Sequence, residues 1–135
     1  MGAWGSGIFE NDTASDWALS LEEARDASLI DETLKTVLSV GGDYLDASVA
    51  EEGLAAAEAV ARLKGRWGTR DAYTEPMDKW VERYNRPPSV ELLRNALSVV
   101  DRVLSAPSEL LELWEESDDA GAWRASIDDL RARLA

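Results

Sequence analysis

Carboxylates are the only abundant side chains with which this chain could carry out acid–base or metal chemistry. Its 135 residues include 27 Asp and Glu but no His and no Cys. A Ser–His–Asp triad, a thiol nucleophile and the usual zinc ligands are therefore excluded. Any reaction would have to use carboxylates, lysine, tyrosine or hydroxyl groups.

The first candidates belong to a glycine-rich N-terminal segment, Met1-Gly-Ala-Trp-Gly-Ser-Gly-Ile-Phe-Glu-Asn-Asp12. Glycine lets neighbouring backbone approach closely, so this segment could form a small-ligand pocket. The structural alternative is an ordered terminus whose tryptophan and phenylalanine fill a gap between helices. The candidate ligand-binding residues are Trp4, Glu10, Asp12 and Asp16, together with Glu58 further along the chain.

Glu58 stands inside the otherwise aliphatic run Leu54-Ala-Ala-Ala-Glu-Ala-Val-Ala-Arg-Leu63. On a helix it would face Arg62 at the i,i+4 spacing, which predicts an ion pair. The alternative is a buried carboxylate that serves as a general base or metal ligand. We predict no cofactor, although Mg²⁺ accepts carboxylate ligands. Three pairs have the Glu-x-x-Glu or Glu-x-x-Asp spacing of such sites, a spacing that 27 acids also produce by chance: Glu23/Asp26, Glu109/Glu112 and Glu112/Glu115.

A different composition marks residues 66–88, where five basic residues stand against four acidic ones. Because Trp, Tyr and Arg are enriched in binding hot spots, this stretch could be a partner surface. The alternative is a connection between helices whose aromatic side chains pack inward. The candidate partner-binding residues are Arg66, Trp67, Tyr73, Trp80 and Tyr84.

The formal net charge of −13 limits the classes of partner. It argues against nucleic acid and against anionic membranes, and it favours a basic protein. No apolar run approaches the roughly 20 residues that span a bilayer, and the N-terminus lacks the basic start and apolar core of a signal peptide. We expect a cytoplasmic protein, whose oligomeric state the sequence leaves open.

Apolar residues at helical spacing recur along the chain and position these candidates. They predict helices over residues 13–25, 29–40, 47–64, 76–85, 90–105 and 122–134, with a short helix opening at Ser108. Asn11, Asp12 or Thr13 should cap the first helix, and Asp46 and Ser89 should cap later ones. The small residues around Glu58 predict a central helix against which the others pack. The expected fold is all-α, a single compact domain of six to seven helices with an ordered N-terminal segment.

The N-terminal motif Met-Gly-x-Trp-Gly-x-Gly-x-Phe-x-Asn-Asp, followed by Asp16-Trp17, resembles a bacterial family described as domain of unknown function 4259. Further stretches shared with that family are Ala55 to Glu58, Leu113 to Ser117 and Asp129 to Leu134. The resemblance implies kinship and a bacterial origin, but no activity and no catalytic residues.

Two functions from different classes follow. The first is a non-enzymatic cytoplasmic protein-binding module of the immunity-protein or antitoxin kind, whose negative charge steers a basic effector. The second is a carboxylate-dependent metal hydrolase or a small-ligand-binding protein. Only the second requires several carboxylates to converge in one pocket.

Overall fold

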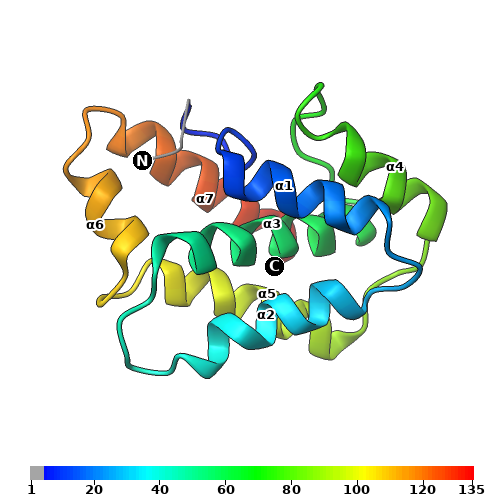
Figure 1. The fold of residues 1–135 in the computed structure, drawn as a ribbon, viewed down its shortest axis with the longest axis horizontal. Coiled ribbons are helices and arrows are strands. Elements are labelled where there is room, and N and C mark those ends of the chain that lie inside the picture. The colour runs from blue at the N-terminus through cyan, green and yellow to red at the C-terminus, as the bar shows by residue number, and fades with distance from the viewer. Residues whose placement is uncertain (1–4) are drawn as a thin grey trace.

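Seven helices build the computed structural model, which describes residues 5–135 (Figure 1). No strand is assigned within residues 5–135, and a parallel bridge joins Leu45 to Ser108. The predicted all-α fold is therefore confirmed. The helices are α1 (Asp12–Glu22), α2 (Ser28–Ser39), α3 (Ala47–Leu63), α4 (Glu75–Tyr84), α5 (Val90–Val103), α6 (Glu109–Glu115) and α7 (Ala120–Leu134).

The helix α3 lies at the centre and contacts each of the other six (Figure 1). Its small side chains allow this, since all five alanines between positions 55 and 61 are fully buried. At Gly53 a Cβ atom would come within 2.6 Å of Val37 on α2 and 3.1 Å of Val99 on α5. The prediction of a central, small-residue helix is confirmed.

The helix ends follow the predicted caps in part. Asn11 caps α1 by accepting a hydrogen bond from Ala14 N at 2.8 Å, and Ser89 caps α5 by accepting one from Leu92 N at 3.1 Å. Asp46 precedes α3 without a capping bond from its side chain. The first amide of α3, Ala47 N, donates instead to Glu109 Oε1 at 2.7 Å, a carboxylate that α6 brings from a distance. The last helix begins two residues before the predicted start.

Buried aromatic side chains join the outer helices to this centre. Trp17 and Trp80 are buried under α1 and α4, and Trp80 Nε1 donates to Ala24 O at 3.0 Å. Trp114 stacks on Trp123 at 5.9 Å between ring centroids, which fastens α6 to α7. From the described N-terminal segment, Phe9 packs into the same core.

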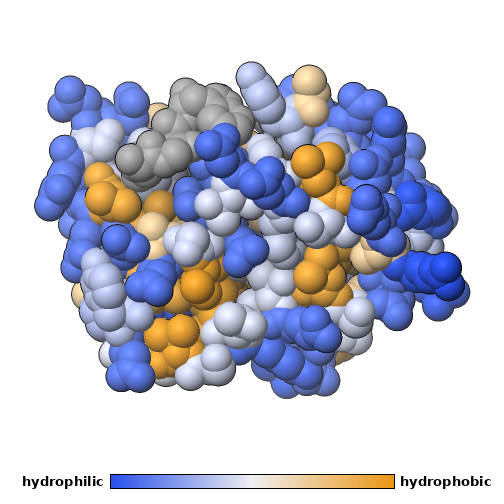
Figure 2. Space-filling view, viewed as in Figure 1, coloured by the Kyte–Doolittle hydropathy of each residue, from blue (hydrophilic) through white to orange (hydrophobic). Residues whose placement is uncertain are grey.

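The surface is mainly hydrophilic on the face shown in Figure 2, where apolar side chains form separate small patches. The most exposed large hydrophobic residues come from four different segments: Leu19, Tyr44, Tyr73 and Val90. None of the described helices combines the length and apolarity needed to cross a bilayer.

Candidate functional site

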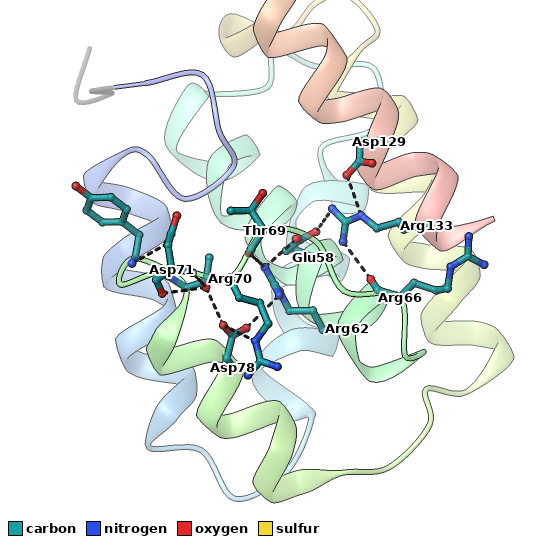
Figure 3. A network of polar contacts seen from close by, with 11 residues as sticks. Glu58, Arg62, Arg66, Thr69, Arg70, Asp71, Asp78, Asp129 and Arg133 are labelled. Atoms are coloured by element: carbon teal, nitrogen blue, oxygen red, sulfur yellow. Dashed lines mark hydrogen bonds and ion pairs between the residues drawn. The ribbon is translucent and has the colours of Figure 1, made fainter.

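A network of buried charges lies at the C-terminal half of α3 (Figure 3). Glu58, Arg62 and the α4 residue Asp78 are each at most 4% exposed. Arg62 Nη2 lies 3.2 Å from Glu58 Oε1, and Arg62 Nη1 lies 3.1 Å from Asp78 Oδ1. The i,i+4 pair predicted from the sequence is thus present, and a second acid that the spacing did not reveal completes it.

Burial lowers the pKa of Arg62 below its ordinary value, against the opposing effects of Glu58 and Asp78. The guanidinium starts from so high a pKa that it stays charged at neutral pH. Its contact with Asp78 Oδ1 lacks hydrogen-bond alignment, so Arg62 Nη1, Arg62 Nε and Asp78 Oδ1 have no hydrogen-bond partner within residues 5–135. The triad is therefore held by charge more than by hydrogen-bond geometry.

Arg133 reaches the same network from α7. Its Nη2 donates to Glu58 Oε2 at 2.8 Å, its Nε to Asp129 Oδ2 at 2.9 Å, and its Nη1 to Arg66 O at 3.2 Å. Burial opposes the charged form, but the bonds and charges of Glu58 and Asp129 outweigh it and raise the pKa of Arg133. Every nitrogen of this guanidinium is thereby engaged.

The network also holds the loop between α3 and α4. Arg62 Nη2 donates to Thr69 O at 2.7 Å, so the two arginines together hold the backbone at Arg66 and Thr69. Between these points, a Cβ atom on Gly68 would lie 2.8 Å from Glu58 Oε1 and 2.9 Å from the Arg133 guanidinium. Glycine is needed here because the loop passes directly over the buried ion pair.

The N-terminal segment bends around a carboxylate. Gly7 N donates to Glu10 Oε1 at 3.0 Å. A Cβ atom would lie 2.4 Å from Glu10 Oε2 at Gly5, and 2.6 Å from Glu10 Oε1 at Gly7. The spacing of these glycines is thus explained by the close approach of the Glu10 side chain.

These parts enclose a pocket of about 140 Å³. It brings together two of the ligand-binding candidates, Glu10 and Glu58, from segments far apart in the sequence. Asp12 and Asp16 are exposed on α1 and do not line it. Trp4 lies outside the described residues. The lining includes Gly7, Glu10, Glu58, Arg62, Thr69, Asp71, Tyr73, Ser126, Asp129 and Arg133.

The partner-binding candidates divide into buried and exposed residues. Trp80 is 1% exposed and stacks on Tyr84 at 4.8 Å, so Trp80 belongs to the core and offers nothing to a surface. Trp67 is half-buried beneath the Arg70 guanidinium, 4.2 Å from its ring centroid. Arg66 and Tyr73 are exposed, and Tyr73 lines the pocket.

A second region, which we call the acidic end, comprises α6 with its following loop and the N-terminal part of α3 with the loop before it. Neither residues 36–61 nor residues 103–123 contain a lysine or an arginine. The two stretches meet, because Leu45 N donates to Pro107 O at 3.2 Å and Glu109 N donates to Leu45 O at 2.9 Å. The exposed or half-exposed acids gathered here are Asp43, Asp46, Glu51, Glu52, Glu109, Glu112, Glu115, Glu116, Asp118 and Asp119.

Arg102, which binds the backbone of this region, does not offset its charge through side-chain ion pairs. Arg102 donates to four backbone carbonyls, those of Gly41, Asp43, Ser105 and Pro107, at 2.7 to 3.0 Å. The accumulated charge affects Tyr44, whose pKa rises to about 12 chiefly through its hydrogen bond to Glu112. The two base-free stretches were visible in the sequence, whereas their juxtaposition was not.

A family model described as "Domain of unknown function (DUF4259)" matches residues 2–126. The chain belongs to the DUF4259 family. The resemblance noted from the N-terminal motif is thereby confirmed. No curated protein and no solved structure matches the DUF4259 chain.

The carboxylates of this DUF4259 domain serve three different ends. Glu58 and Asp78 are consumed in buried ion pairs, Glu10 shapes the N-terminal segment, and those of the acidic end face solvent. Within residues 5–135, no three acids converge in an arrangement that could hold a metal ion. Four carboxylates do line the pocket, those of Glu10, Glu58, Asp71 and Asp129, but they do not form such an arrangement.

Proposed function

We propose that this protein is a non-enzymatic module of the bacterial cytoplasm that binds a basic protein partner through the acidic end. An inhibitor of the immunity-protein or antitoxin kind is the class that we favour. The observation that carries the proposal is the meeting of two base-free stretches, one around the start of α3 and one around α6.

The distribution of basic residues supports this proposal. Arg62, Arg102 and Arg133 fasten parts of the fold to one another, so much of the positive charge is used internally. The acids of the acidic end have no base among the described residues within salt-bridge distance. A surface of one sign attracts an oppositely charged protein and speeds its association.

The distribution of exposed apolar side chains supports the same conclusion. Large contiguous apolar patches are what mark hydrophobic docking sites. The face in Figure 2 shows only separate small ones. On this face, recognition through charge is therefore better supported than recognition through an apolar groove.

The test compares two variants with the same net charge. One carries Glu112→Gln, Glu115→Gln and Glu116→Gln at the acidic end. The other carries Glu23→Gln, Glu32→Gln and Glu91→Gln, which are exposed elsewhere and make no ion pair among the described residues. Each, with a C-terminal tag, is used to capture partners from native lysate beside the unmodified protein.

We expect the unmodified protein and the control variant to retain one stoichiometric, salt-sensitive partner that the acidic-end variant loses. The proposal is overturned if no saturable partner is found, or if the two variants capture it equally well.

A further inference from the structure

We infer that the pocket between the N-terminal segment, the loop after α3 and α7 is a binding site for a guanidinium group, supplied by an arginine of the basic partner. The choice of a partner arginine rests on the proposed function. The choice of a guanidinium rests on the pocket itself.

Three carboxylate oxygens of the pocket are acceptors left open. Glu10 Oε2, Asp71 Oδ2 and Asp129 Oδ1 have no partner among residues 5–135, while the other oxygen of each carboxylate accepts a hydrogen bond. Among the donors, Arg133 uses all three nitrogens. The two Arg62 nitrogens without a hydrogen bond, Nε and Nη1, are buried, and Nη1 lies 3.1 Å from Asp78 Oδ1. A ligand that fits must bring donors.

The charge of the lining favours a cation. The lining contains more negative than positive side chains: the carboxylates of Glu10, Glu58, Asp71 and Asp129 against the guanidinium groups of Arg62 and Arg133. Glu58 is neutralised from both sides, so the excess negative charge lies nearer the rim, where Asp129 is 65% exposed. A free carboxylate or phosphate would be repelled there.

The size of the pocket limits the cation to a small head group. A volume of about 140 Å³ corresponds to about four or five water molecules at their liquid volume. A guanidinium fits this space and presents five donors in one plane, which suits carboxylates arriving from several directions.

The pocket and the acidic end can serve one partner. Ser126, which lines the pocket, is six residues from the start of α7, a distance of about 9 Å along the helix. The helix α7 itself follows directly from the loop of the acidic end (Figure 1). A basic partner lying along α7 would reach both.

The experiment titrates the full-length protein with propylguanidinium and, as a neutral control of nearly the same shape, propylurea. Binding is followed through the backbone amide resonances of Gly7, Thr69, Asp71 and Ser126. We expect saturable shifts with propylguanidinium and none with propylurea. Equal response to the two compounds, or shifts located elsewhere, would overturn the inference.

Two variants test the lining. Glu10→Gln with Asp129→Asn keeps the shape of both side chains and should weaken the affinity for propylguanidinium about tenfold. The neighbouring Asp128→Asn is the matched control, since Asp128 is exposed and pairs with Arg124 outside the pocket. If Asp128→Asn weakens binding as much, general charge rather than the pocket is responsible, and the inference is wrong.

A blocked Gly-Arg-Gly peptide distinguishes the source of the group. Binding of the peptide in the same pocket supports a partner arginine. Binding of propylguanidinium without the peptide excludes that source and assigns the pocket to a free guanidinium compound. The acidic-end variant should bind propylguanidinium normally. If partner capture depends on the acidic end but not on Glu10 and Asp129, the inference fails while the proposed function stands.

Discussion

The charged network at the C-terminal half of α3 and the acidic end at its N-terminal half use the same residue types in opposite ways. In the network, Glu58 and Asp78 are buried and each lies against arginine. At the acidic end, carboxylates gather in solvent with no lysine or arginine on either contributing stretch. The contrast shows that some carboxylates of this protein hold the fold together, whereas others are exposed to solvent at the surface. The carboxylates of the acidic end have no base among the described residues within salt-bridge distance.

Removing the central arginine should produce the largest effect. Arg62→Met leaves Glu58 and Asp78 buried without their shared counterion and releases the loop at Thr69. We expect the free energy of unfolding to fall by about 3–5 kcal/mol, measured by denaturant titration at neutral pH. The surface pair of Arg124 and Asp128 provides the control, because Arg124→Gln should cost less than about 1 kcal/mol. A similarly small loss at Arg62 would contradict the structural role of the network.

Two glycines give the next largest difference. Gly68→Ala forces a methyl group against Glu58 and Arg133, both of which are held in place, and should destabilise the fold by about 1–3 kcal/mol. Gly121→Ala, in α7, meets nothing within 4 Å and should stabilise it by up to about 1 kcal/mol. Thermal unfolding of the two variants measures this. If both substitutions changed the stability in the same direction, the loop at Gly68 would not pass as closely over the buried ion pair as the structure shows.

Neutralising the acidic end should change stability much less than either. The variant with Glu112→Gln, Glu115→Gln and Glu116→Gln alters exposed side chains, and a glutamine at position 112 can still accept the hydrogen bond from Tyr44. Its free energy of unfolding at neutral pH should therefore stay within about 0.5 kcal/mol of the unmodified protein. Relief of like-charge repulsion would make any change a stabilisation. A loss comparable to that of Arg62→Met would mean that these acids also hold the fold together.

The sequence predicted the parts of this comparison that depend on local spacing. The Glu58–Arg62 pair, the central small-residue helix and the Asn11 and Ser89 caps each involve residues within one turn or one periodic face. It did not predict Arg133 on Glu58, 75 positions away, or Glu109 on the start of α3, because such contacts depend on how helices pack.

The candidate site divides in the same way. Glu10 and Glu58 were singled out by unusual local surroundings, and packing brings both to the pocket. Asp71 and Asp129 were missed because each looks like an ordinary surface acid in the sequence. Only the packing of the loop that follows α3 against the helix α7 brings them to one pocket. Trp80 was named as a partner-binding candidate from composition, with inward packing as the alternative, and the structure shows the inward packing. Its burial under α4 follows from the helical spacing of Met77, Trp80 and Val81, which also gave a usable signal.

The most local effect concerns a single proton at the acidic end. The fold raises the pKa of Tyr44 from 10.0 to about 12, first through its 2.7 Å hydrogen bond to Glu112, then through burial and nearby carboxylates. A raised pKa means that the fold favours the neutral phenol. Its contribution to stability is therefore complete below pH 10 and is lost as pH rises toward about 12.

Tyrosinate absorbance is measured against pH in the unmodified protein and in Tyr44→Phe. The difference between the two titrations belongs to Tyr44 and not to the other tyrosines. Glu112→Gln should move the pKa of Tyr44 back toward the ordinary value, since the amide carries no charge and binds the phenol less strongly. Glu91→Gln, on α5, should leave it unchanged. If Tyr44 ionises near pH 10 in the unmodified protein, the carboxylates of the acidic end lie farther apart than the structure places them. The difference between the acidic end and the buried network would then be one of amino-acid composition, without the close approach of carboxylates at the acidic end.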